Sequence, residues 1–135
     1  MNGRGSRAKG ADGEREVLRI LEDQLGLKLV RNAQQTARGG RDICEDVDRM
    51  QGPIKFSIEV KRQETLCLPA WWAQTVEQAR AVHRIPVLFF RGNRQPWRVA
   101  LCPSDVNESA WPKGRDYAPI VMSLEVGLQF LREAM

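Results

Sequence analysis

The most regular alternation of apolar and polar residues lies between positions 54 and 61. Its apolar positions are Ile54, Phe56, Ile58 and Val60, and its polar positions are Lys55, Ser57, Glu59 and Lys61. An alternation of period two predicts a β-strand. Because same-face neighbours on a strand lie about 7 Å apart, we expect Glu59 and Lys61 to project side by side.

Two interpretations of the Glu59 and Lys61 pair follow from the pattern alone. The strand can be an ordinary amphipathic edge strand whose Glu–Lys pair is solvated. Alternatively, the carboxylate holds a divalent cation and the ammonium beside it steadies a water or a developing phosphate charge. The remaining residues must decide between them.

The rest of the chain alternates between helical and extended patterns. In chain order, the sequence predicts a helix at about 11–25, strands at 27–31, 42–44 and 54–61, a helix at about 70–83, a strand at 85–91 with a hairpin partner at 97–102, a short strand at 120–122 and a last helix at about 124–133 capped by Ser123. The segment 45–52 is interpreted as a hairpin connection that makes the strand at 42–44 the neighbour of the strand at 54–61.

Glu14 is an acidic residue within the apolar stripe of the first helix. The stripe contains Val17, Leu18, Leu21 and Leu25, whereas Glu16 is expected on the opposite side. A carboxylate on the core-facing side must be paired, protonated or bound to a metal, because burying it bare is costly. The alternative is that Glu14 merely suits the helix dipole in a solvated first turn.

Asp42 opens a predicted strand directly after a polar loop at 32–41. That loop contains Gln35, Arg38, Gly39-Gly40 and Arg41. An aspartate at this position is compatible with a turn or cap residue. It is also compatible with a carboxylate placed beside a basic, ligand-binding loop.

The composition is that of one ordinary globular domain with a basic excess. The chain has 135 residues, of which 42% are hydrophobic and 28% charged, and 21 Lys and Arg face 17 Asp and Glu for a net charge of +4. The basic residues cluster, which favours a polyanionic partner. We expect residues 1–9 to be a flexible basic arm, or a tail without a role, and residues 10–135 to form a single domain.

Cysteine usage and hydropathy exclude several classes of protein. The three cysteines form no CxxC pair and His83 is the only histidine, so a structural zinc site is not expected. Reduced thiols in a cytosol are the simplest interpretation. No apolar run approaches about 20 residues, so no membrane span is expected, and no apolar segment follows the basic N-terminus as in a secretory signal.

Several motifs together resemble a known family. The run from Lys9 to Leu21 resembles the opening helix of the Holliday junction resolvases of archaea and phages. Asp42-Ile43 and Ile58-Glu59-Val60-Lys61 resemble the signature of the PD-(D/E)XK nuclease core. The resemblance extends from about residue 9 to residue 90. It implies an α/β fold with a restriction-endonuclease-like mixed central β-sheet flanked by α-helices.

The resemblance also implies roles for individual residues. Asp42 and Glu59 would be metal ligands together with the backbone carbonyl of Val60, Glu14 would assist metal or water binding, and Lys61 would be the catalytic lysine. The expected cofactor is Mg²⁺, with Mn²⁺ as a substitute. Residues expected to contact DNA are Arg4, Arg7, Lys9, Arg31, Gln35, Arg38, Arg41, Arg62 and Gln74.

The function implied is metal-dependent, structure-selective cleavage of branched DNA, specifically Holliday junction resolution. The resemblance further implies a homodimer in the cytoplasm of a bacterial, archaeal or phage-infected cell. One alternative is another nuclease on the same core, such as a nickase, a flap nuclease or a restriction-type enzyme. The other is a DNA-binding or assembly protein without catalysis, in which the Glu–Lys strand is solvated.

Overall fold

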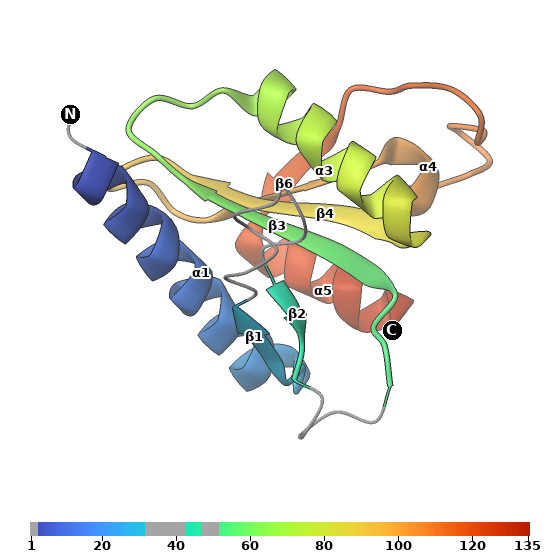
Figure 1. Ribbon diagram of the computed structural model, residues 1–135. Helices are drawn as coiled ribbons and strands as arrows, with labels where there is room; N and C mark the ends of the chain where they lie inside the picture. Colours follow the sequence, from blue (N-terminus) through green and yellow to red (C-terminus); the bar gives the residue numbers. More distant parts are fainter. Residues whose placement is uncertain (1–2, 32–42, 47–51) are drawn as a thin grey trace.

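The computed structural model describes residues 3–31, 43–46 and 52–135 (Figure 1). In chain order its elements are α1 (Gly3–Leu25), β1 (Leu29–Arg31), β2 (Ile43–Glu45), β3 (Phe56–Arg62), α3 (Leu68–Val82), β4 (Ile85–Arg91), β5 (Arg98–Leu101), α4 (Pro103–Val106), β6 (Ile120–Ser123) and α5 (Leu124–Ala134). Ser123 accepts a hydrogen bond from the backbone N–H of Val126, so its predicted capping of the last helix is confirmed.

Four strands form a mixed sheet in the order β3-β4-β5-β6. β3 and β4 are parallel and are connected through α3, whereas β4–β5 and β5–β6 are antiparallel. β1 and β2 form a separate antiparallel ribbon. Figure 1 shows α3 on one face of the sheet and α1 and α5 on the other. The predicted α/β class, a mixed sheet flanked by helices, is therefore confirmed.

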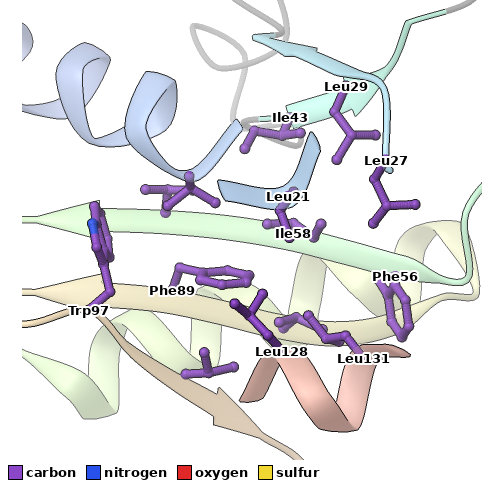
Figure 2. Close-up of a cluster of buried hydrophobic side chains, with 14 of the residues drawn as sticks. Leu21, Leu27, Leu29, Ile43, Phe56, Ile58, Phe89, Trp97, Leu128 and Leu131 are labelled. Carbon is purple, nitrogen blue, oxygen red and sulfur yellow. The ribbon is translucent and has the colours of Figure 1, made fainter. Parts of the chain in front are cut away.

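The larger apolar cluster lies between the sheet, α1 and α5 (Figure 2). Each element contributes side chains, among them Leu21, Ile58, Phe89, Leu128 and Leu131, and the β1–β2 ribbon adds Leu29 and Ile43. A second cluster, which includes Trp71, Trp72, Leu88 and Phe90, lies under α3. The sheet is thus buried on both faces.

α1 begins eight residues earlier than the sequence predicted. It starts at Gly3 and includes residues 3–9, which we expected to be a flexible arm. Glycine costs about 1 kcal/mol in a helix interior, so Gly10 and Gly13 weakened the helical signal. Gly13 packs closely against β3, because a Cβ there would lie 3.1 Å from the Cβ of Arg62 and would require a small shift of that side chain.

Among the described residues, the expected hairpin ladder between β2 and β3 is not formed. β2 pairs with β1, in a register that places Ile43 opposite Arg31, and within the described ranges it forms no ladder with β3. A side chain links the two instead: the Glu45 carboxylate accepts hydrogen bonds from the backbone N–H of Ile54, at 3.1 Å, and from the Arg84 guanidinium.

Candidate active site

β3 presents different chemistry to its two sides. Ile58 and Val60 belong to the apolar cluster under α1 and α5. By alternation, Glu59 and Lys61 point to the side of α3. The register agrees, because Glu59 lies opposite Leu88 and Lys61 opposite Phe90, both members of the α3 cluster. The predicted placement of Glu59 and Lys61 on one face is confirmed.

Glu59 is fully buried, with 0% of its surface exposed. The interpretation of a solvated Glu–Lys pair is therefore wrong for the carboxylate. Lys61, two residues further along, is only partly buried. The strand thus places a carboxylate inside the protein and an ammonium nearer its surface. A buried carboxylate is costly unless hydrogen bonds, a counter-charge or a cation compensate it.

Glu14 is also buried, with 7% exposed, as its place in the apolar stripe predicted. Its Oε2 accepts a hydrogen bond of 2.6 Å from Nε of Arg31, the last residue of β1. The interpretation of Glu14 as a solvated first-turn residue is wrong. The ion pair also ties α1 to the β1–β2 ribbon, and it gives Arg31 a carboxylate partner within the protein.

Of the expected site residues, the structure brings Glu59 and Lys61 to one face of β3, but it does not place Glu14 with them. Asp42 lies outside the described residues. Glu14 comes from α1, on the face of the sheet opposite the one to which Glu59 points. β3 is the edge strand of the four-stranded sheet. Glu14 and Glu59 are therefore on different sides of the same edge strand.

Several expected DNA contacts are not placed. Gln35, Arg38 and Arg41 fall outside the described ranges, as do the side chains of Arg4, Arg7 and Lys9. Gln74 is half-buried on α3. Arg62, the last residue of β3, is half-buried and takes part in a polar network that sequence reasoning missed.

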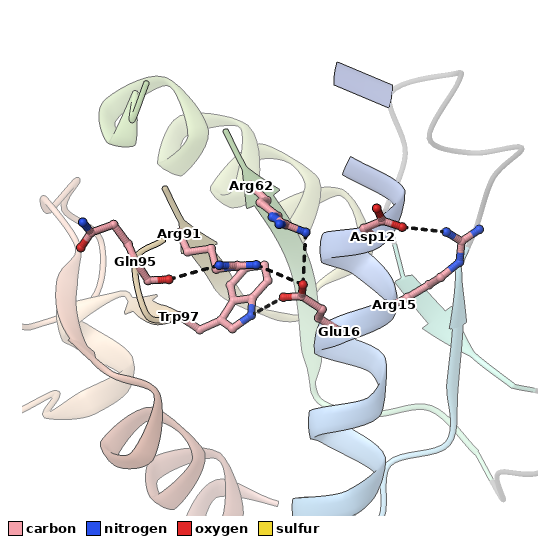
Figure 3. A network of polar contacts seen from close by, with 7 residues as sticks. All are labelled: Asp12, Arg15, Glu16, Arg62, Arg91, Gln95 and Trp97. Carbon is pink, nitrogen blue, oxygen red and sulfur yellow. Dashed lines mark hydrogen bonds and ion pairs between the residues drawn. The ribbon is translucent and has the colours of Figure 1, made fainter. Parts of the chain in front are cut away.

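The missed network converges on Glu16 (Figure 3). One carboxylate oxygen accepts hydrogen bonds of 3.1 Å from Arg62 and from Arg91, and the other accepts one of 2.9 Å from Nε1 of Trp97. The Arg91 guanidinium also stacks over the Trp97 ring at 5.3 Å. Glu16 does point away from the apolar stripe. Its partners are 46 to 81 positions away in sequence, so no local pattern could reveal them.

The residues on β3 fit a hard divalent cation by their chemistry. A carboxylate from Glu59 and the backbone carbonyl of Val60 are oxygen donors, which Mg²⁺ and related ions prefer. The complete burial of Glu59 is the observation in favour of such a site. Within residues 3–31, 43–46 and 52–135, no group of three or more His, Cys, Asp and Glu side chains could hold a metal ion.

Comparison with known families identifies the chain. A family profile described as "Phage putative PDDEXK endonuclease" matches residues 5–129. The chain belongs to this family. The PD-(D/E)XK assignment is thereby confirmed, and the chain is a nuclease by family.

A solved structure is similar to the chain. It is Hjc of Archaeoglobus fulgidus, a Holliday junction resolvase from an archaeal hyperthermophile, with 21% sequence identity, a TM-score of 0.46, and coverage of 87% of this chain and 86% of that one. No curated protein shows a significant match to the chain. None of the helices in the described part of the chain has the length and apolar character needed to cross a membrane.

Proposed function

We propose that this PDDEXK endonuclease is metal-dependent and selective for branched DNA, and that it resolves Holliday junctions. The observation that carries the proposal is the fully buried Glu59 carboxylate, with Lys61 two residues away on the same face of β3. Membership of a nuclease family supports phosphodiester cleavage. The resemblance of residues 9–21 to the opening helix of junction resolvases supports the branched substrate.

The proposed metal ligands are the carboxylates of Glu59 and Asp42 and the backbone carbonyl of Val60, with Glu14 assisting. Oxygen ligands of this kind suit Mg²⁺, and Mn²⁺ would substitute for it. When bound, the cation would polarise the scissile phosphate and lower the pKa of a water. Arg31 holds the Glu14 carboxylate in place through its 2.6 Å hydrogen bond.

Lys61 is proposed to stabilise negative charge on the phosphoryl oxygens as the phosphodiester bond breaks. A lysine ammonium acts as a compact point charge with three donors. Donors fixed in advance near developing charge contribute most to electrostatic catalysis. β3 is hydrogen-bonded to β4 along its whole length, including the pair Lys61 and Phe90, so the backbone that carries Lys61 is held in place.

The DNA would be held by basic and amide side chains around this strand. We propose contacts from Arg4, Arg7, Lys9, Arg31, Gln35, Arg38, Arg41, Arg62 and Gln74. Symmetric incision of two strands of a four-way junction needs two active sites, so we propose that the protein acts as a homodimer.

A panel of labelled DNA substrates tests the proposal. Four-way junction, flap, duplex and single-stranded DNA are incubated with Mg²⁺, Mn²⁺, Ca²⁺ or a chelator. We expect junction cleavage with Mg²⁺ or Mn²⁺, and binding without cleavage with Ca²⁺, whose looser coordination does not support the reaction. Asp42→Asn should lower the cleavage rate about 1000-fold, equivalent to about 4 kcal/mol, while junction binding is retained.

Asp23→Asn is the matched control, because it removes one carboxylate charge from an exposed position on α1. It should cleave as the wild type does. Cleavage of no substrate with any metal, or full activity of Asp42→Asn, would refute the proposal. Preferential cutting of flaps or duplexes would replace junction resolution by another nuclease activity.

A further inference from the structure

A charged groove lies beside α1, on the face of the sheet opposite Lys61. It has a volume of about 490 Å³ and is bounded by Trp97 and by α1. Its charged lining residues are Asp12, Arg15, Glu16, Arg19 and Arg62. The proposed catalytic residues Glu59 and Lys61 do not line it.

The Glu16 network holds one wall of the groove in a fixed geometry. Arg62 and Arg91 both donate to the same oxygen of Glu16, and Trp97 donates to the other (Figure 3). Arg62 uses one Nη of its five N–H donors in this contact. Its Nε is buried and, in the part of the chain that the structure describes, has no hydrogen-bond partner. The contact with Glu16 orients this guanidinium in advance, and the Nη donors that Glu16 does not use, rather than the buried Nε, are the ones left for another acceptor.

The charge balance around the groove favours an anion. Arg62 and Arg91 carry two positive charges, and Glu16, which accepts hydrogen bonds from both, carries one negative charge. Arg15 and Arg19 are exposed and add two further positive charges, of which Asp12 offsets one through its 3.2 Å ion pair with Arg15. The surroundings thus combine four guanidinium groups with two carboxylates.

The position of the groove relative to Lys61 suggests which anion binds. Arg62 directly follows Lys61 on β3, and successive side chains of a strand point to opposite faces. The end of β3 therefore offers one cation to each side of the sheet. A polyanion that passes this strand end would meet both cations, whereas a small anion would meet only one.

We propose that this groove binds a backbone phosphate of the DNA, on the side of β3 opposite the cleavage site. The proposal rests on the proposed function and adds to it a second point of contact. Arg15, Arg19 and Arg62 are the phosphate-binding side chains. Glu16 is a positioning residue, since it acts on the phosphate only by orienting Arg62.

A binding titration in the absence of metal tests the groove separately from cleavage. The affinity of the protein for a labelled four-way junction is measured with a chelator present, over a range of salt concentrations. The double substitution Arg15→Ala and Arg19→Ala should weaken binding about tenfold at 0.1 M salt. It should also lower the slope of log affinity against log salt by about one or more.

The matched control removes two exposed arginines elsewhere. Arg80→Ala with Arg115→Ala gives the same net charge but changes a region outside the groove, near α3 and residue 116. We expect this control to lose less than threefold in affinity. Equal losses in the two double variants, or no loss in the groove variant, would overturn the proposal. Thermal unfolding of both variants verifies that they are folded.

A third arm distinguishes DNA from a free phosphate. Inorganic phosphate is titrated into the wild type and the groove variant by calorimetry. Millimolar or weaker binding to the wild type is expected for a groove that needs the polyanion. Micromolar phosphate binding that the groove variant loses, with unchanged DNA affinity, would overturn the proposal in favour of a small-anion site. Because no arm depends on cleavage, failure of the proposed function and failure of the groove are separable.

Discussion

β3 and β4 are neighbouring strands with the same length and similar burial but different chemistry. Each has seven residues, and they pair in parallel from one end to the other. β4 is apolar on both faces, with Val87 and Phe89 toward α1 and α5 and Leu88 and Phe90 toward α3. β3 is apolar only toward α1 and α5.

The difference separates what the fold needs from what it merely tolerates. A strand buried on both faces is stabilised by apolar side chains on both, as in β4. In β3, Ser57 and Glu59 occupy positions with 0% exposure, where apolar side chains would be more stable. Residues that break such a local rule concentrate at functional sites. The polar face of β3 therefore agrees with the proposed active site, which stays a proposal.

The largest expected effects come from substituting, one at a time, the two residues that lie opposite each other on β3 and β4, Glu59 and Leu88. Leu88→Ala should lower the free energy of unfolding by about 3 kcal/mol, because it removes a fully buried side chain from the α3 cluster. Its cleavage rate per folded molecule should stay within a few-fold of the wild type. Glu59→Gln keeps the shape of the side chain and should slow cleavage about 1000-fold. Denaturant unfolding and single-turnover cleavage are measured for both.

The contrast between β3 and β4 is refuted if Glu59→Gln leaves cleavage intact or if Leu88→Ala abolishes it. Rapid cleavage by folded Glu59→Gln would mean that the β3 carboxylate is structural. A 1000-fold slower cleavage by folded Leu88→Ala would mean that the chemistry depends on the whole α3 face and not on Glu59.

Much of the sheet could be predicted because its signals are local. The bounds of β4 follow from a continuous apolar run, and the direction of Glu59 and Lys61 follows from period two. The burial of the polar face of β3 could not be predicted. Alternation shows which residues share a face, but not which element covers that face. Here α3 covers it, through residues more than ten positions further along the chain.

The candidate site was predictable only where a pattern constrained it. Glu14 was found because it interrupts an apolar stripe, and its burial is confirmed. The Glu16 network was missed because its donors Arg62, Arg91 and Trp97 come from distant segments that meet only in the folded chain. Asp42 stays a prediction.

A smaller effect on stability is expected from Glu45, which contacts the chain just before β3 and just before β4. Glu45 accepts hydrogen bonds from the backbone of Ile54, just before β3, and from Arg84, just before β4. Burial raises its pKa, but these hydrogen bonds and the Arg84 charge outweigh that effect and hold the pKa below the ordinary 4.5. Glu45 therefore stabilises the fold above pH 4.5, and this contribution is lost as the pH falls through the lowered pKa.

Glu45→Gln tests this link. The substitution should cost about 1–2 kcal/mol at pH 7, the range for hydrogen bonds to a charged group. The difference from the wild type should shrink as the pH falls from 5 to 3, measured by urea unfolding. Glu125→Gln, at an exposed position on α5, is the control. A difference that is independent of pH would show that the Glu45 charge does not hold β2 against the sheet.

The smallest expected effect is a gain in stability from the polar face of β3. Ser57 is fully buried, and its hydroxyl has no hydrogen-bond partner among the residues that the structure describes. Ser57→Ala should raise the free energy of unfolding by about 1 kcal/mol, because it removes an unsatisfied polar group. Thr75 on α3 is the matched control, since its equally buried hydroxyl donates a 2.7 Å hydrogen bond to the Trp71 carbonyl. Thr75→Val should give no gain. A loss of stability in Ser57→Ala would show that this hydroxyl has a hydrogen-bond partner in solution. The polar face of β3 would then destabilise the fold less than the comparison with the apolar β4 indicates.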